Sequence, residues 1–136
     1  MALFDWNEDY AVGVESMDLD HREVLHLTNE LQSAVREGAP LQELLQKFDR
    51  AFDVLKASME REETVLKGAD YRAYRFHKRE HEDVIRILHE YRSNVGDGSA
   101  TFCSSALEFL GGWLISHFRG EDRCAGQFLN RLAKAS

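Results

Sequence analysis

The sequence predicts an all-α fold, an up-down-up-down antiparallel four-helix bundle with an N-terminal arm and a short C-terminal helix. Apolar residues recur at helical spacing in four long stretches, and β-branched residues do not alternate with polar ones over the length of a strand. The chain contains a single Pro. Because the connections between the stretches are short, neighbouring helices are expected to run antiparallel.

The first expected elements are an irregular arm and a helix. Aromatic and apolar side chains in the arm stand among Asn, Asp and Gly, and we expect them to pack on the helices; they are Trp6, Tyr10, Val12 and Val14. Asp18 or Asp20 can cap the first helix, because a side-chain oxygen there accepts from a free N–H of the first turn. This helix runs to about Arg36, and Gly38 ends it.

Three more long helices complete the expected bundle. The second begins near Pro40 and reaches Lys67, since Pro suits the first turn of a helix. The third spans about 71–93 and the fourth about 100–118. Gly120 is expected to interrupt the chain before the last helix. The expected parts are the arm (1–18), the four-helix bundle (19–118) and the short C-terminal helix (122–133), which together form one domain over residues 1–136.

The composition is that of a globular protein: 43% of residues are apolar, 30% are charged, and the net charge is −7. This acidic balance does not attract nucleic acid or anionic lipid. The apolar runs are far shorter than the roughly 20 residues of a membrane span. The first residues lack the basic and apolar regions of a signal peptide, so we expect a cytoplasmic protein. Cys103 and Cys124 form no C-x-x-C pair, and we expect small buried residues without a function of their own.

Each predicted helix carries a potential metal ligand on its apolar face. His77 and His81 lie one helical turn apart on the same face and can share one metal ion. Glu62 lies on an apolar face too, and a carboxylate is rarely buried unless it is paired or binds a cation. The candidate ligands are His21, Glu62, His77, His81, His117 and Asp122. Each His alone could be a hydrogen-bonded core residue and Asp122 a helix cap, but their convergence from four helices favours a metal site.

Mixed imidazole and carboxylate ligands suit iron, manganese or zinc. Two carboxylates among six ligands favour two ions, because a carboxylate can bridge. The Glu-x-x-His spacing of ferritin-like di-iron bundles does not occur on the appropriate face. The segment His77-Lys78-Arg79-Glu80-His81 matches the H-x-x-E-H signature of zinc hydrolases, yet Glu80 falls about 100° off the face of the two imidazoles. The alternatives are therefore a zinc hydrolase, a mononuclear metal-binding bundle and a metal-free interaction module whose polar core pairs His with Glu.

Several motifs follow one another along the chain: Phe4-Asp5-Trp6, Val12-Gly13-Val14, Met17-Asp18-Leu19-Asp20-His21, Glu62-Glu63, His77-x3-His81 and Trp113-Leu114-Ile115-Ser116-His117-x4-Asp122. In this order and spacing they resemble the bacterial hemerythrins over nearly the whole chain. The resemblance implies a bridged non-haem di-iron site that binds O₂ reversibly. It also implies the ligand roles: His77, His81 and His117 hold one iron, Glu62 and Asp122 bridge, and His21 serves the second iron.

One position departs from the family pattern. The second helix of the family carries His-x3-Glu, whereas this chain has Ser58 four residues before Glu62. A neutral hydroxyl is a poor ligand for divalent iron. Three outcomes stay open: a second iron completed by water, a largely mononuclear centre, or another residue that moves in. The spare histidines are expected to lie away from the site, and the neighbouring acids to face other directions; these residues are His26, His89, Glu60 and Glu63.

The resemblance implies a protein that binds O₂ or a related small ligand, such as NO or peroxide, for sensing, storage or detoxification. We expect a binding protein rather than an enzyme, although a peroxidase-like side activity fits an altered second iron. The cofactor that the resemblance implies is iron, and no nucleic-acid or membrane partner is expected. Apolar residues such as Leu25, Leu55 and Leu114 are expected to line the pocket near the second iron and to exclude water.

Overall fold

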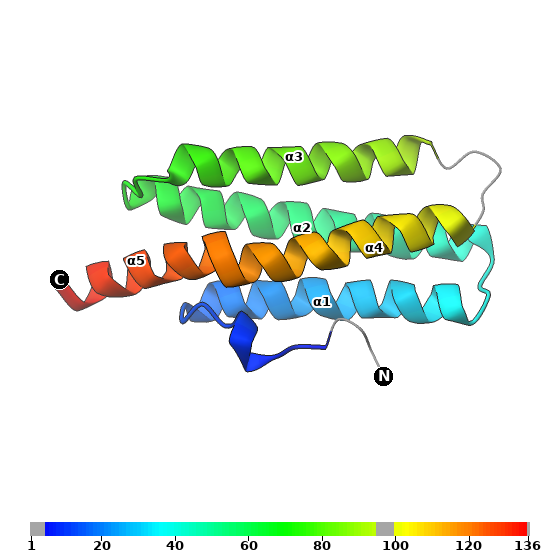
Figure 1. The fold of residues 1–136 in the computed structure, drawn as a ribbon, viewed down its shortest axis with the longest axis horizontal. Coiled ribbons are helices and arrows are strands. Elements are labelled where there is room, and N and C mark those ends of the chain that lie inside the picture. The colour runs from blue at the N-terminus through cyan, green and yellow to red at the C-terminus, as the bar shows by residue number, and fades with distance from the viewer. Residues whose placement is uncertain (1–4, 95–99, 136) are drawn as a thin grey trace.

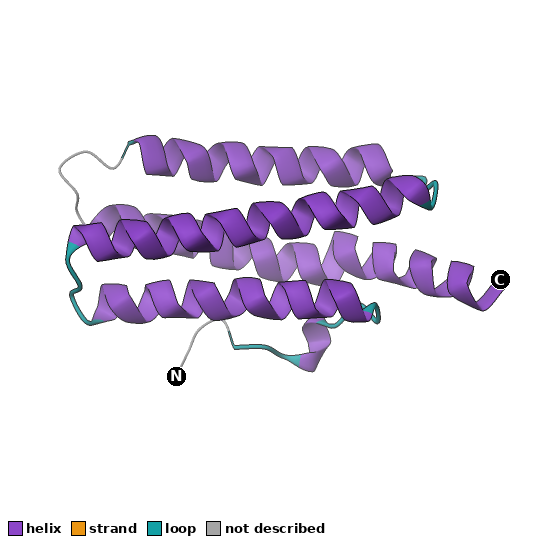
Figure 2. Cartoon of the chain, turned by 180° about the vertical axis from the view of Figure 1, so that it is seen from behind, coloured by secondary structure: helices purple, strands orange, loops and turns teal. Residues whose placement is uncertain are grey.

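The computed structural model describes residues 5–94 and 100–135, with the side chains of 100–103 excepted. Four long helices form an antiparallel bundle, which confirms the predicted fold class (Figure 1). They are α1 (Glu15–Arg36), α2 (Leu41–Gly68), α3 (Tyr74–Ser93) and α4 (Ala100–His117). Figure 2 shows helices and loops only, and none of the described residues forms a strand. Phe4 and the Cys103 side chain lie outside the described part.

The arm is shorter than predicted, because α1 begins at Glu15 and not at residue 19. Neither Asp18 nor Asp20 caps this helix, so that prediction was wrong. The Asp18 carboxylate turns back along the chain and accepts from the backbone N–H groups of Val12 (2.8 Å) and Gly13 (3.3 Å). Asp20 instead pairs with Arg61 of α2 through two hydrogen bonds of 2.8 and 3.1 Å. Both carboxylates thus tie α1 to neighbouring segments.

The connections lie close to their predicted places. Gly38 follows α1 with a φ of 70°, a left-handed conformation that Gly adopts at little cost. Pro40 immediately precedes α2. The third helix begins at Tyr74 rather than at about residue 71, because the Tyr71 N–H donates to the carbonyl of Leu66 and so closes α2 (3.0 Å).

The chain is not interrupted at Gly120, contrary to the prediction. A π-helical turn, η2 (Phe118–Asp122), joins α4 directly to α5 (Arg123–Ala135), and Figure 1 shows them as one continuous rod. Each residue of an α-helix advances by about 100°, so Asp122 would otherwise lie about 140° around the axis from His117. The wider π turn, whose hydrogen bonds span five residues, brings the two side chains to the same side.

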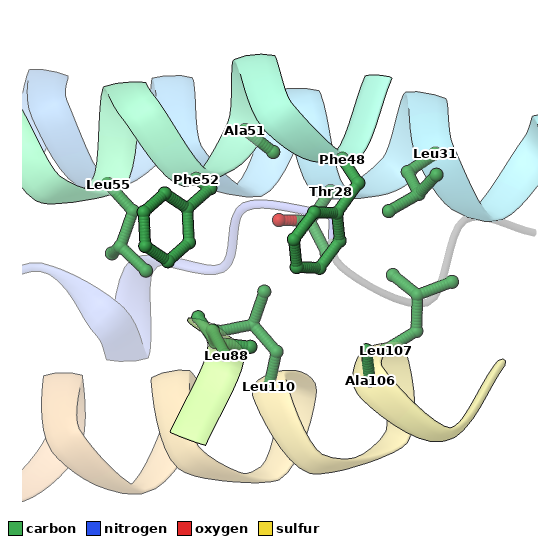
Figure 3. A pocket seen from close by; sticks show the side chains of 10 residues that line it. All are labelled: Thr28, Leu31, Phe48, Ala51, Phe52, Leu55, Leu88, Ala106, Leu107 and Leu110. Atoms are coloured by element: carbon green, nitrogen blue, oxygen red, sulfur yellow. The ribbon is translucent and has the colours of Figure 1, made fainter. Parts of the chain in front are cut away.

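The core runs along the bundle axis and contains a small apolar cavity of about 10 Å³ (Figure 3). Each long helix contributes a lining residue that lies seven positions from a candidate ligand: Thr28, Leu55, Leu88 and Leu110. Seven residues span about 10 Å of helix, so the cavity lies that far along the axis from the candidate ligands. Leu25, Leu55 and Leu114 are all buried in the core, and only Leu55 of these three lines this cavity. Their expected place in a pocket near the second iron stays a prediction.

Cys124, expected to be a small buried residue, is exposed on α5. No helix within the described ranges combines the length and the apolar character that would allow it to cross a membrane.

Candidate metal centre

Three imidazoles and two carboxylates converge inside the bundle. His81 Nε2 lies 3.1 Å from His117 Nε2. Asp122 Oδ1 lies 3.0 Å from Nε2 of His77 and 3.1 Å from Nε2 of His117. Glu62 Oε1 contacts Nε2 of His77 and lies 3.4 Å from Nε2 of His81. All five residues are buried, and each offers a ligand atom within 4.8 Å of the others, a spacing that suits one metal ion. We call this group the three-histidine side.

His21 lies on the other side of the two carboxylates. Its Nε2 is 3.3 Å from Glu62 Oε2 and 3.3 Å from Asp122 Oδ2. Each carboxylate therefore directs one oxygen toward the three-histidine side and the other toward His21. We call the group of His21 Nε2 and these two other oxygens the His21 side. Carboxylates placed in this way can bridge two metal ions.

The donor atoms fit a metal better than they fit one another. Asp122 is 1% exposed, and its Oδ1 makes no hydrogen bond, although two imidazole nitrogens lie about 3 Å away. A buried polar atom without a hydrogen bond is costly, and metal coordination is one way to satisfy it. Imidazole and carboxylate together are a donor set for iron, manganese or zinc. The six predicted ligands thus lie together and form a cluster that can hold metal.

Comparison with known proteins agrees with this geometry. Residues 12–125 match the family model described as the hemerythrin HHE cation binding domain. A bacteriohemerythrin of Stenotrophomonas maltophilia is 30% identical over 126 residues, which cover 90% of this chain and 79% of the relative. The chain belongs to the hemerythrin family. A bacteriohemerythrin of Pseudomonas aeruginosa is 28% identical, covering 90% of this chain and 78% of the relative. A hemerythrin-like protein of Naegleria gruberi is 23% identical over 119 residues, which cover 88% of this chain and 87% of the relative.

Protons compete with metal for the ligands of this hemerythrin-like, metal-binding protein. Burial would lower the pKa of His77, but its interactions with the Asp122 and Glu62 carboxylates outweigh burial and raise that pKa to about 10. Burial also opposes the protonation of His21 and His81, whose pKa values the nearby carboxylates nevertheless raise. Burial would raise the pKa of Glu62, yet hydrogen bonds from His21 and His77 hold it well below its usual range.

Aromatic rings and a further acid fix the orientation of the imidazoles in this hemerythrin. Trp113 stacks on His117 with ring centroids 4.3 Å apart, and Phe118 stacks on His21 at 4.1 Å. His81 Nδ1 lies 2.8 Å from Glu63 Oε2, which leaves Nε2 of His81 directed at the centre.

Sequence reasoning placed Glu63 on another face of α2 and therefore missed this contact. The side chain lies about 100° around α2 from Glu62, but it is long enough to reach His81 on the adjacent helix α3. A Glu next to a buried Glu was the only sign of this role in the sequence.

Ser58 occupies the position where the hemerythrin pattern leads us to expect a histidine. It lies one turn before Glu62 on α2 and is 3% exposed, so its face of the helix is buried with the centre. The spare histidines lie away from the centre, as predicted, and both are exposed: His26 pairs with Glu30 on the surface of α1, and His89 lies on the outside of α3. Neither can replace the missing imidazole in this arrangement.

Glu80, the residue that a zinc hydrolase would use as its base, is not part of the five-residue group. It belongs to a second, partly buried group with Glu121 that shares His117 with the first, and Glu121 lies 3.6 Å from Nδ1 of His117. Since Nε2 of His117 faces the three-histidine side, these acids lie behind its ring.

Proposed function

We propose that this protein holds two iron ions, bridged by Glu62 and Asp122, and that it binds O₂ or a related small ligand, such as NO or peroxide, for sensing, storage or detoxification. The observation that carries the proposal is the two-sided placement of both carboxylates between His21 and the three other histidines. Bound iron supplies reversible electron exchange with such ligands. In this proposal His77, His81 and His117 hold the first ion, and His21 holds the second.

The two ions would be held unequally. The three-histidine side offers three imidazole nitrogens and two carboxylate oxygens, whereas the His21 side offers one imidazole nitrogen and the other two oxygens. Ser58 adds no strong donor there. The second ion would therefore keep positions open to solvent or ligand, which favours exchange, oxidation and reaction with NO or peroxide over simple O₂ storage.

Burial defines what reaches the centre. His21 and Ser58 are each 3% exposed and Asp122 is 1% exposed, so bulk water is largely excluded. The surrounding core is apolar, and its cavity, about 10 Å along the axis from the ligands, is only large enough for about one small molecule. This environment suits a diatomic ligand better than a peptide or a sugar, and it weighs against the zinc hydrolase alternative, in which the Glu80 side chain would have to face the metal.

Metal analysis and absorption test the proposal together. Protein produced in iron-rich medium should contain about two irons per chain and absorb in the near-ultraviolet and visible, as a bridged ferric pair does. The His77→Gln variant should lose iron, and His89→Gln, which changes an exposed histidine on the same helix, should not. One iron per chain would favour the mononuclear alternative. Colourless protein with zinc would revive the hydrolase, and colourless protein without metal the interaction module.

Ligand binding is tested on the reduced protein. Exposure of the ferrous form to O₂ should change its spectrum, and removal of O₂ should restore it if the protein is a carrier. The open second ion predicts that this reversal is incomplete and that NO or peroxide reacts readily. A ferrous protein whose spectrum responds to none of the three ligands would refute the proposed function.

A further inference from the structure

A row of aromatic rings connects the N-terminal arm to His21. Trp6 contacts Tyr10 edge to face, with ring centroids 6.0 Å apart. Tyr10 in turn lies 6.4 Å from Phe118, which stacks on the His21 ring at 4.1 Å with an interplanar angle of 14°. Phe118 is 2% exposed, so it is held between the arm and the imidazole. Displacement of the arm would remove the packing on Phe118, the ring that stacks on His21.

The arm is also fixed directly between the helices that carry His21 and Asp122. The Asp18 carboxylate, three residues before His21, accepts from the N–H groups of Val12 and Gly13. On the other side Gly126, one turn after Asp122, packs against the Val12 carbonyl. A Cβ atom added at Gly126 would lie 2.2 Å from that carbonyl oxygen, far inside contact distance, so only Gly allows this approach.

The three-histidine side depends less on these contacts. His77 and His81 project from α3, and Figures 1 and 2 show the arm running beside α1 on the far side of the bundle from α3. His117 and Asp122 belong to the rod of α4 and α5, on which the arm packs. The other two imidazoles of this side do not belong to that rod. A change confined to the arm should therefore act unequally on the two sides of the centre.

We propose that the arm is a positioning element for the second metal ion. The arm packs on Phe118, and its Val12 segment lies between Asp18 of α1 and Gly126 of α5. These contacts fix His21 of α1 relative to Asp122 of the π turn. With Ser58 in place of an imidazole, these two residues supply two of the three protein ligands on the His21 side, so small shifts between α1 and η2 cannot be compensated there. This inference rests on the proposed function, in which two ions bind.

Gly126→Ala tests the inference in the full-length chain. The added methyl group must push the Val12 segment away, while Ala raises the helix propensity of α5. Gly112→Ala in α4 and Gly68→Ala in α2 are matched controls, because a Cβ at either position meets nothing within 4 Å beyond its chain neighbours and the backbone of its own helix. Metal-free proteins are titrated with Zn²⁺ in a calorimeter, and thermal melts show that each variant is folded.

We expect two binding events in the parent and in both control variants. In Gly126→Ala the second event should weaken by about 10–100-fold, the usual effect of losing support for a metal ligand, and the first should change less than about twofold. Equal weakening of both events would indicate a general effect on the fold and would overturn the inference. Unchanged affinity of the second event would overturn it as well.

A second pair of variants tests the other attachment of the arm. Asp18→Ala removes both acceptors of the arm N–H groups, whereas Asp18→Asn loses the charge but keeps one oxygen for Val12. The second affinity should fall in Asp18→Ala and recover in large part in Asp18→Asn; equal affinities in the two variants would contradict a role of the hydrogen bond. A parent that binds a single ion would refute the two-ion function and this inference together, whereas two ions held equally well by parent and variants would refute the inference alone.

Discussion

Replacing Ser58 with His is the sharpest test of the unequal centre. Ser58 is 3% exposed on α2, one turn before Glu62, and the hemerythrin pattern leads us to expect that an imidazole there faces the His21 side. The His21 side would then offer two imidazole nitrogens and two carboxylate oxygens in place of one nitrogen and two oxygens. Even a side chain that only orients a metal ligand contributes about 10–100-fold to metal affinity. A whole added ligand should therefore raise the affinity for the second ion by at least about tenfold, or ~1.4 kcal/mol.

The same substitution should destabilise the metal-free protein. A larger, polar side chain enters a packed interior, which typically costs about 1–3 kcal/mol. We therefore expect Ser58→His to unfold at lower urea concentration than the parent without metal, and to recover that loss when two ions bind. Stability gained on metal binding is the linked effect of the tighter second ion.

Two-step titration of the metal-free protein with Zn²⁺ measures this change, and iron content after growth in iron-rich medium gives the stoichiometry. Ser58→Ala is the control, because a hydroxyl that does not ligate the metal can be removed with little change in either affinity. The reasoning is refuted if folded Ser58→His binds the second ion no more tightly than the parent. Two irons per chain in both proteins would show that Ser58 does not impair loading with iron.

Three further predictions concern the surroundings of the centre. Glu63→Gln should weaken the first ion by about 10–100-fold, because it removes the charge 2.8 Å from His81 Nδ1; calorimetric titration measures this, and Glu60→Gln, an exposed acid on the same helix, should have no effect. Leu88→Ala should enlarge the apolar cavity and lower the free energy of unfolding in urea by about 2–5 kcal/mol. Leu132 is 47% exposed on α5, so Leu132→Ala should change that free energy by less than about 0.5 kcal/mol. Similar losses in both variants would contradict the buried packing of Leu88. The metal-free protein should lose stability as pH rises toward 10, because the pKa of His77 is about 10 when folded and 6.5 when unfolded, so its contribution is complete below pH 6.5 and lost through pH 10. Urea unfolding at pH 6, 8 and 10 measures this loss, which should be smaller in His77→Gln; a metal-free parent that is as stable at pH 10 as at pH 6 would contradict it.

The sequence alone was sufficient for the four long helices and for the faces that they bury in the core. A period of 3.6 places His77 and His81 on one buried face whatever the neighbouring helices do, so their partnership is a local property of the chain. The positions of His21, Glu62 and His117 on apolar faces follow from the same periodicity. Four helices with apolar faces must bury them together, and buried polar side chains at similar depths then meet.

Only the tertiary structure decided what depends on distances between helices. No local rule predicted the π turn that brings Asp122 beside His117. Gly120 has the signature of a helix end, and a π turn differs from an α-helical turn by a single extra residue. The reach of Glu63 to His81 depends on where α3 lies beside α2, and the contact of Gly126 with Val12 joins residues more than a hundred positions apart. Periodicity determines which face of a helix is buried, whereas packing determines which atoms meet there, because contacts between distant segments arise only when the whole chain is folded.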